Sequence, residues 1–463
     1  LRGATLQGKE RPRRPAVRVA FSAGEASGDA YAAAINTTLR RELVGTPWHI
    51  SDSRWSEVMG RFLRDLPDDA SIRQAIEDFD SLDLVETIMM LEDEFDVELI
   101  EDEVRGLTTF AELKSYIRSK PRKLTVLENL ICEGIGGARS REAGIQLVAD
   151  SSKWGAIGIA ESFKVGFRVL LGYLQMRSHL GKGAPGVFVP IDFGFVNIRL
   201  ARHAKRFGWK VLYFIPPGSW RRDRQGVDLP AVTDKIVTPF PWSAEILNSM
   251  GGSAHFFGHP LKEMALRDLV ERGDTIAVLP GSRQAELERH LPILAASLPD
   301  DRIAEFAVAP SIQVADLSGK WRELAPNRND IFTQGDTYGV FQRAQAAIVC
   351  SGTATLEAAL CKCPMVVIYR VSRLVELQGR LMGLTGRHIS LPNILMGREV
   401  VPELVQNEAT PENVRNRLES LLLDSLERQA QLEAFDELDE LLGPPTAITR
   451  TAELLAEMAG FKP

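Results

Sequence analysis

The segment Leu279-Pro280-Gly281-Ser282-Arg283 has residue types suited to binding a pyrophosphate. Gly281 and Ser282 stand where a β-branched run passes into a helical stretch, so their backbone N–H groups can face an anion. Arg283 adds a planar cation that binds two oxygens at once and would stabilise the charge on a departing diphosphate. Glu286 follows three residues later. The alternative is a surface Pro-Gly turn with a solvated arginine.

A second turn of small residues, Ser351-Gly352-Thr353, also opens a helical stretch. Glu357 lies four residues after Thr353 and therefore on the same helix face. A carboxylate in this position can accept hydrogen bonds from the hydroxyl groups of a ligand. The alternative is that Glu357 is a capping partner within a buried helix.

Asp192 directly follows the apolar run 186–191, which predicts a strand. Doubly wound sheets bind their ligands at the carboxyl ends of the strands. A carboxylate there can take the proton from an attacking hydroxyl. The alternative is that Asp192 caps a helix that begins around Asn197.

A serine between acidic residues, Asp80-Ser81-Leu82-Asp83, begins another helical stretch. An exposed hydroxyl at a helix start is accessible to a modifying enzyme, and the helix N-terminus favours an added phosphate. The alternative is an N-cap serine on an acidic amphipathic helix, which needs no function.

The elements that must position these residues alternate between strands and helices. A β-branched run at 17–21 leads into the turn 22–29 and a helix over 30–43, the first unit of an α/β domain. Such units return after residue 127 and predict two doubly wound, Rossmann-like halves joined near 258–263. The further predicted strands are 186–191, 210–215, 235–237, 255–258, 275–279, 305–308, 347–349 and 365–369, and the chain ends in helices from 411 to 458.

Residues 51–118 interrupt this pattern with helices separated by acidic loops. They contain 19 acidic and 7 basic residues, a charge of −12, whereas the rest of the chain has a charge of +5. We therefore predict three domains: a discontinuous first domain (16–50 and 119–260), an inserted all-α four-helix domain (51–118), and a second α/β domain (261–463). The opposite charges favour encounter between the insert and the rest of the chain, or between the insert and basic partners. Alternatively, each charge simply keeps its own surface soluble.

The composition, 44% hydrophobic and 25% charged, is that of a soluble globular protein. The four cysteines lie in or beside apolar runs, which predicts buried thiols in a reducing compartment. Residues 1–15 have no apolar core, so no signal peptide is expected, and no window is long enough to span a membrane. We expect no nucleic-acid partner.

Residues 51–118 resemble acyl carrier proteins in the order of their helices and in Asp80-Ser81-Leu82-Asp83. The resemblance implies 4′-phosphopantetheine on Ser81 as a cofactor, with an acyl chain carried as a thioester. A phosphopantetheinyl transferase and acyltransferases are the implied partners of this acidic domain. Glu86, Asp93 and Glu94 would recognise such partners, or are simply solvated helix residues.

The rest of the chain resembles lipid-A-disaccharide synthases, which implies a GT-B fold and an inverting glycosyl transfer. It would join UDP-2,3-diacylglucosamine to 2,3-diacylglucosamine 1-phosphate, giving a β-1′,6-linked disaccharide and UDP. The resemblance is strongest in the second half. The matching segments are 22–29, 134–137, 191–192, 258–260, 279–286, 351–357 and 390–394.

The resemblance assigns roles to particular residues. Asp192 matches the proposed general base. No Asp-x-Asp pair stands where it would hold Mg²⁺, so we predict no metal and expect Arg283 and helix dipoles to take its place. The residues implied to bind the nucleotide sugar are Gly281, Ser282, Arg283, Glu286, Ser351, Gly352, Thr353, Glu357 and Asn393. Those implied to face the cleft and the acceptor are Gly24, Glu25, Ser27, Gly28, Asp29, Asn197 and His259.

Two departures from the family lie in the half that would face the acceptor. Phe195 stands near the place of a second acidic residue, and 216–222 keeps one tryptophan, followed by two arginines. The acceptor could therefore be a different acylated sugar, or the chain could be a carrier and scaffold without turnover. Retained Asp192, Arg283 and Glu357 argue against the scaffold.

The stretch 154–180 is apolar but carries Lys164, Arg168 and Arg177. This composition suits a helix lying on an anionic membrane and equally an ordinary core helix. With the family's lipid substrates, it predicts a cytoplasmic protein in peripheral contact with the cytoplasmic face of the inner membrane.

Overall fold

The computed structural model describes most of the two predicted α/β halves. The described residues are 17–24, 26–45, 88, 91–92, 95, 97, 99–100, 103–104, 106–120, 130–152, 154, 159–223, 225–226, 228–265, 272–371 and 388–461.

Two parallel sheets form the two halves, and both have buried central strands. The first sheet has the order β3-β2-β1-β4-β5-β6-β7 and the second has the order β10-β9-β8-β11-β12-β13. The strands of the first sheet are β1 Val17–Ala23, β2 Leu130–Gly136, β3 Gln146–Asp150, β4 Val187–Ile191, β5 Lys210–Phe214, β6 Lys235–Val237 and β7 Ala254–His255. Those of the second are β8 Thr275–Leu279, β9 Ala304–Val308, β10 Ile331–Gln334, β11 Ala344–Cys350, β12 Met365–Tyr369 and β13 Glu403–Val405.

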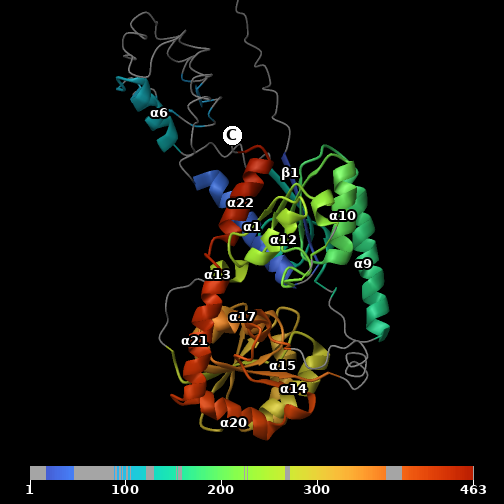
Figure 1. Cartoon of the computed structure of the whole chain (residues 1–463), viewed down its shortest axis with the longest axis vertical. Coiled ribbons are helices and arrows are strands. Elements are labelled where there is room, and N and C mark those ends of the chain that lie inside the picture. The colour runs from blue at the N-terminus through green and yellow to red at the C-terminus, as the bar shows by residue number, and fades with distance from the viewer. Residues whose placement is uncertain are drawn as a thin grey trace, which may run out of the picture.

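Helices cover both faces of the first sheet (Figure 1). On one face α1 (Ala26–Gly45) packs against α8 (Ala138–Glu142), and on the other α9 (Ile159–Leu180) and α10 (Gly194–Arg206) lie side by side as an outer layer. The remaining helices of this half are α11 Leu229–Val232, α12 Pro241–Ser249 and α13 Pro260–Ala265.

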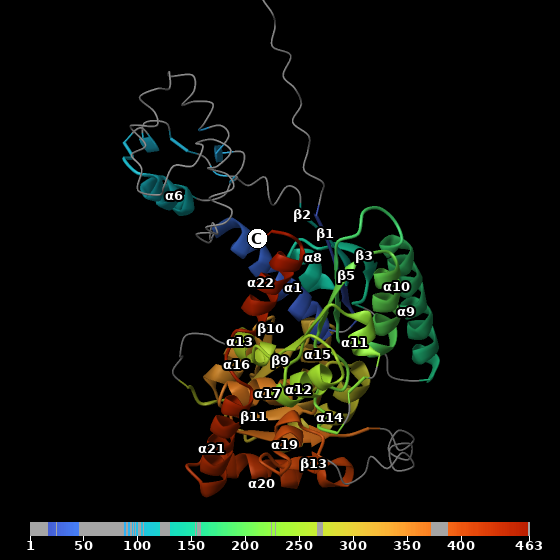
Figure 2. The same ribbon diagram turned by 45° about the horizontal axis from the view of Figure 1, so that its top comes forward.

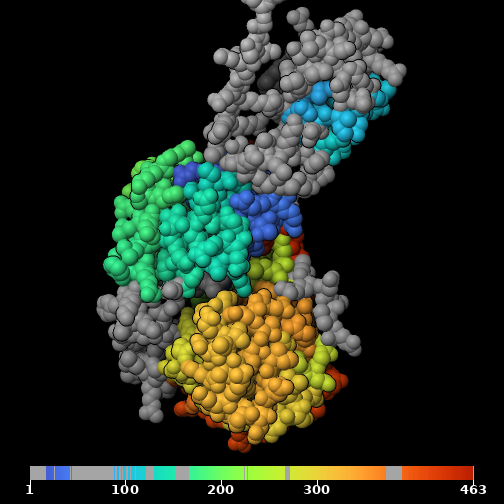
Figure 3. Space-filling model, turned by 180° about the vertical axis from the view of Figure 1, so that it is seen from behind, coloured from blue at the N-terminus to red at the C-terminus, as the bar shows by residue number. Residues whose placement is uncertain are grey.

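The second sheet is covered in the same way by the helices that follow its strands. These are α14 Gln284–Ser297, α15 Val314–Leu324, α16 Thr337–Arg343, α17 Thr353–Leu360, α19 Leu391–Met396, α20 Pro411–Leu422 and α21 Leu426–Leu441. Figure 3 shows the two bodies from behind, with the teal and green segments of the first half above the yellow and orange segments of the second.

The last helix, α22 (Ala447–Met458), returns to the first half and packs against α1. It does so with a strongly amphipathic face whose buried residues include Ile448 and Leu455. The sequence placed all of 261–463 in the second half; by packing, α22 belongs with the first. The chain therefore crosses between the halves twice, and one core cluster contains residues of both.

Each sheet reverses its strand order once, between β1 and β4 in the first and between β8 and β11 in the second. Ligands of doubly wound sheets bind outside the carboxyl ends of the strands at such points. The turns that the sequence singled out follow β1, β4, β8 and β11. The fold thus brings them to the ligand-binding edges of the two sheets.

Between α1 and β2 the chain leaves the first sheet, and α6 (Phe110–Ser119) lies apart from both sheets in two views (Figures 1 and 2). The Thr109 hydroxyl accepts from the Glu112 N–H and the Glu112 carboxylate accepts from the Thr109 N–H, forming a capping box at the start of α6. Ser81 and its flanking acidic residues lie outside the described residues, whereas Ile88, Leu91, Glu92 and Phe95 of the same insert are described and helical. In the part of the chain that the structure describes, no helix is both long and apolar enough to cross a membrane.

Candidate active site

The turn after β4 has a strained backbone. Asp192 and Phe193 have φ angles of 44° and 46°, in the left-handed region that residues with a side chain seldom adopt. Such conformations cost about 1–3 kcal/mol each and persist where the surroundings impose them. Here the Asp192 N–H donates to Phe214 O at 3.1 Å, and the Asp192 carbonyl accepts from the Tyr213 hydroxyl at 2.8 Å. The turn that carries the predicted base is therefore held by neighbouring β5.

Asn197 holds the same turn from within α10. Its side-chain N–H groups donate to the carbonyls of Ser22, Ile191 and Asp192 at 2.9–3.0 Å. Its side-chain oxygen accepts from the Ser22 hydroxyl at 2.6 Å, and the residue is fully buried. Asn197 was predicted to face the cleft; instead, its amide joins the ends of β1 and β4. It is a positioning residue for Asp192.

The helix after this turn begins at Gly194 with Phe193 in the N-cap position. The alternative interpretation, that Asp192 caps a helix starting around Asn197, is therefore wrong. The Phe193 ring lies over Gly24, where a Cβ atom would come within 2.5 Å of it. Gly24 thus lets the turn after β1 pack directly on the turn after β4.

Asp29 belongs to the first loop motif but does not face the cleft. Its buried carboxylate accepts hydrogen bonds from the backbone N–H groups of Gly137, Arg139 and Ser140 at 2.6–3.1 Å. These groups begin α8, where a negative charge is favourable. Asp29 therefore anchors the motif 134–137 to α1. This contradicts its predicted direct role, and the reason is a partner more than 100 residues away.

The remaining residues of the first loop can be placed only in part. Gly28 is buried in the first turn of α1 and packs near Ala23 and Ile191, while Ser27 is half-buried. Glu25 lies outside the described residues.

The turn after β8 is built around a buried carboxylate. Glu286 accepts from the Ser282 N–H at 2.8 Å and from the Arg283 guanidinium at 3.1 Å. Gly281 has a φ of 124°, and a Cβ atom there would lie 2.5 Å from Glu286. Glu286 was predicted to touch the nucleotide sugar; instead, it fixes the turn and Arg283. The Arg283 side chain remains 47% exposed and can still meet an anion.

His290 is a site-positioning residue that sequence reasoning missed. The buried ring lies 2.7 Å (Nδ1) from Pro280 O and accepts the Arg370 N–H at Nε2 at 3.0 Å. These partners fix the neutral ring with its proton on Nδ1. Burial lowers the pKa of His290, which keeps it neutral. The ring thereby connects the Gly281 turn to the end of β12. In the sequence, only the spacing of His290 from Gly281 could have indicated this role.

The turn after β11 is closed by the segment 388–403. The Ser351 hydroxyl donates to Ile389 O at 2.8 Å, and Thr355 accepts from the Leu391 N–H at 3.2 Å. Gly352 has a φ of 141° in an exposed position, and Thr353 begins α17. The turn is therefore accessible, although Ser351 itself is engaged.

Asn393 was predicted to bind the nucleotide sugar, but its amide is used within the protein. It donates to Val401 O and Glu403 and accepts from the N–H groups of Val400 and Val401, all within 2.7–2.9 Å. The residue is completely buried. Its contribution is to hold the loop that closes the Ser351 turn.

Glu357 on α17 interacts electrostatically with groups of both halves. Burial raises its pKa, opposed by nearby Tyr338 and by the charge of Arg139 on α8. The pKa of Tyr31 on α1 is also raised by burial, then by the negative charges of Glu357 and Asp192. Tyr31 and Tyr338 belong to one core cluster. The negative charges of the predicted base and of the predicted ribose ligand thus both raise the pKa of one buried tyrosine on α1.

The family model described as lipid-A-disaccharide synthetase matches residues 111–456. Lipid-A-disaccharide synthase of Myxococcus xanthus is 31% identical over 380 residues, covering 78% of this chain and 96% of that protein. The Anaeromyxobacter dehalogenans enzyme of that name is 36% identical over 346 residues, covering 69% and 88%.

The chain belongs to the lipid-A-disaccharide synthase family. It is a glycosyltransferase, and its two parallel-sheet domains are consistent with a GT-B fold, as the sequence predicted. Among solved structures, the calicheamicin glycosyltransferase CalG4 is only distantly similar, with a TM-score of 0.45, 13% identity, and coverage of 72% of this chain and 92% of that one.

A second family model, described as a phosphopantetheine attachment site, matches residues 53–117. It spans nearly all of the insert predicted at 51–118. This lipid-A-disaccharide synthase family member therefore carries a phosphopantetheine-attachment segment between α1 and β2.

His259 lies at the junction of the two halves. It is 7% exposed, and burial lowers its pKa to about 3. Its Nδ1 accepts the Leu261 N–H at 3.2 Å, and its backbone N–H donates to Leu442 O at 2.8 Å. Gly258 before it has a φ of 95° and lies against Pro444 O. In this family member the Gly-His-Pro segment thus holds the point where the chain crosses between the halves. Its imidazole is neutral.

Proposed function

We propose that this chain transfers diacylglucosamine from UDP-2,3-diacylglucosamine to 2,3-diacylglucosamine 1-phosphate, giving a β-1′,6-linked disaccharide and UDP. The observation that carries the proposal is the strained Asp192 turn, held by Asn197 and Tyr213, in the half opposite the Arg283 turn. One half can thus hold a base at the acceptor while the other holds a cation at the leaving group.

The reaction is an inverting displacement at the anomeric carbon. Asp192 takes the proton of the acceptor 6-hydroxyl, and that oxygen forms a bond to the donor C1. The bond from C1 to the UDP oxygen breaks, and its electron pair leaves with UDP. Arg283 and the backbone N–H groups beside it stabilise the added charge. Glu357 holds the ribose hydroxyls of the donor.

A lipid acceptor requires a membrane-facing surface, and α9 supplies one. Phe167, Leu170, Leu171 and Leu174 are 44–62% exposed and follow the helical spacing i, i+3, i+4 and i+7. We call these four residues the apolar stripe. Arg168 and Arg177 are exposed on the same helix and suit anionic lipid headgroups. The stripe favours peripheral contact with the cytoplasmic face of the inner membrane over the core-helix alternative.

The insert would carry 4′-phosphopantetheine on Ser81. The sugar transfer itself uses no carrier-bound acyl group. A tethered carrier instead raises the local concentration of an acyl donor, or recruits acyltransferases that act on the same lipids.

The decisive experiment measures UDP release with UDP-2,3-diacylglucosamine and 2,3-diacylglucosamine 1-phosphate, comparing wild type with Asp192→Ala. We expect release by the wild type and a loss of at least about 10² in kcat, the scale of general-base catalysis. Release with only another acylated sugar would indicate a different acceptor. Absence of release with every lipid acceptor, despite UDP binding, would favour the scaffold.

A further inference from the structure

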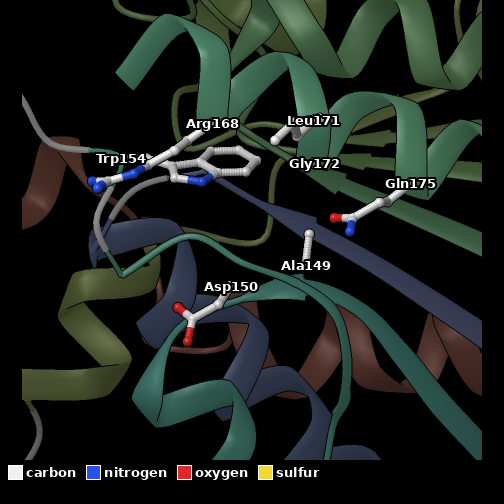
Figure 4. A pocket seen from close by; sticks show the side chains of 7 residues that line it. All are labelled: Ala149, Asp150, Trp154, Arg168, Leu171, Gly172 and Gln175. Carbon is white, nitrogen blue, oxygen red and sulfur yellow. The ribbon is translucent and has the colours of Figure 1, made fainter. Parts of the chain in front are cut away.

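A pocket of about 320 Å³ lies between α9 and the carboxyl end of β3. Figure 4 shows the indole of Trp154 between the helix above and Ala149 below, with Leu171 and Gly172 on the upper wall. The volume is at the lower end of small-molecule sites, roughly 300–1,000 Å³. It has room for a short apolar segment but not for a whole lipid.

The wall of this pocket reaches the catalytic turn. Trp154 is 7% exposed, and its ring lies 5.8 Å from the ring of Phe193, tilted by 40°. Phe193 directly follows Asp192. Gly172 makes the arrangement possible, because a Cβ atom there would come within 2.5 Å of the indole. The Trp154–Phe193 pair thus connects the pocket to the turn that carries the predicted base.

The rim of the pocket is polar at its two ends. Arg168 and Gln175 both come from α9, and in Figure 4 they lie at opposite ends of the pocket. Asp150 lies below and is paired with Arg141 at 2.8 Å. Arg168 can therefore meet an anionic ligand at the mouth.

The apolar stripe continues from this pocket along the outside of α9. Leu171 belongs to both, since it lines the pocket and is 44% exposed. A hydrocarbon chain that enters the pocket can therefore continue past Leu171 onto the apolar stripe. Burial of each methylene group contributes about 0.8 kcal/mol to such binding.

We propose that this pocket is an acyl subsite, which binds a short run of methylenes beyond the fourth carbon of one acyl chain of the lipid acceptor. The rest of that chain runs along the apolar stripe toward the membrane. Arg168 at the mouth matches the negative charge of the acceptor phosphate, and the shared wall with Phe193 sets the sugar beside Asp192. The inference rests on the proposed function and adds to it the place that selects acyl-chain length.

The test uses a substitution at an exposed position that narrows the mouth of the pocket, so that folding is preserved. Gln175→Trp places an indole at the rim, and Ser178→Trp, one turn away on the same helix and exposed, is the matched control. UDP release is measured in mixed micelles with acceptors that carry either myristoyl or butyryl chains. Binding of the myristoyl acceptor without donor is measured by equilibrium dialysis.

We expect Gln175→Trp to raise the ratio of KM for the myristoyl acceptor to KM for the butyryl acceptor roughly tenfold, which is what losing the burial of about two methylenes gives. Its dissociation constant for the myristoyl acceptor should rise in parallel, and Ser178→Trp should keep the wild-type ratio. An unchanged ratio in Gln175→Trp, with UDP still released, overturns the subsite but not the proposed function. No release from any acceptor by the wild type overturns the proposed function instead.

A further experiment distinguishes an acyl chain of the acceptor from an acyl chain carried by the insert. Ser81→Ala should show the wild-type KM ratio and the same change on Gln175→Trp. If Ser81→Ala abolishes chain-length selection, the pocket holds a carrier-bound chain and the proposal is overturned.

Discussion

The side-chain amide of Asn197 donates to the backbone carbonyl of Asp192 at 2.9 Å, so a buried residue of α10 fixes the backbone of the predicted catalytic base. The same amide reaches Ser22 and thereby connects the loops after β1 and β4. A constraint on the backbone of a base acts on catalysis through the direction in which its side chain points.

Asn197→Ala should lower kcat roughly 10- to 100-fold while the KM for the UDP-sugar changes little, because only the orientation of Asp192 is affected. Steady-state kinetics of UDP release provide the measurement. Asn248→Ala is the control, since the exposed Asn248 donates to and accepts from the backbone of Ala254 in the same half, away from Asp192. Equal losses of kcat in both variants would mean that Asn197 matters only for folding.

Arg283→Lys should lower kcat about 10²-fold, the scale of losing one preorganised donor to a developing anion. Lysine keeps the charge but not the planar fork that binds two oxygens. The affinity for UDP, measured by calorimetry, should fall as well. Arg289→Lys one turn later removes a guanidinium that donates to Ala285 O and should have little effect. If the two lysine variants behaved alike, Arg283 would be an ordinary surface arginine.

The neutral state of His259 makes stability depend on pH. Its pKa falls from 6.5 in the unfolded chain to about 3 in the folded protein. Below pH 6.5 the unfolded state therefore binds the extra proton, and the contribution of His259 to stability is lost at up to about 1.4 kcal/mol per pH unit. That contribution is fully present above pH 6.5.

His259→Asn keeps an acceptor for the Leu261 N–H but cannot titrate. In urea unfolding at pH 7.5 and pH 5.5, the variant should lose less stability on acidification than the wild type, by roughly 1 kcal/mol. The other histidines contribute equally to the pH dependence of both proteins, so their contributions cancel in the difference. Parallel loss of stability in both would show that His259 is already charged in the folded state.

Ser81 should accept 4′-phosphopantetheine, because the segment 53–117 matches a phosphopantetheine attachment site and Ser81 stands between Asp80 and Asp83. Intact-mass spectrometry after incubation with coenzyme A and a phosphopantetheinyl transferase measures the modification. Ser71→Ala in the same segment should gain the same mass as wild type, and Ser81→Ala should gain none. A mass gain in Ser81→Ala would place the arm elsewhere.

Much of the fold could be predicted from local pattern. The predicted strand 17–21 lies within β1, and 275–279 coincides with β8. Short apolar runs between helical stretches are a local signal, so they are visible along the chain. The strand β3 was missed because its two end residues, Gln146 and Asp150, are polar and leave an apolar run of only three residues; the Trp154 pocket lies at its carboxyl end.

The roles of individual side chains were harder to predict than the elements. Asp29, Asn197, Glu286 and Asn393 were all predicted to touch ligands, yet each is buried and bonded within the protein. Family motifs locate such residues at the site but do not distinguish a residue that touches the ligand from one that holds the loop. The distinction depends on partners such as Gly137, which is 108 residues from Asp29.

The sequence by itself determined the two α/β halves, the turns that end their strands, and the carrier-like insert, because each of these is encoded by neighbouring residues. The tertiary structure decided how the turns are held and what they face. It placed α22 of the last segment on α1 of the first, brought the charges of Glu357 and Asp192 near enough to raise the pKa of buried Tyr31, and formed the Trp154 pocket beside Phe193. These relationships join residues far apart in the chain, and burial and hydrogen bonding select them only once the halves have packed.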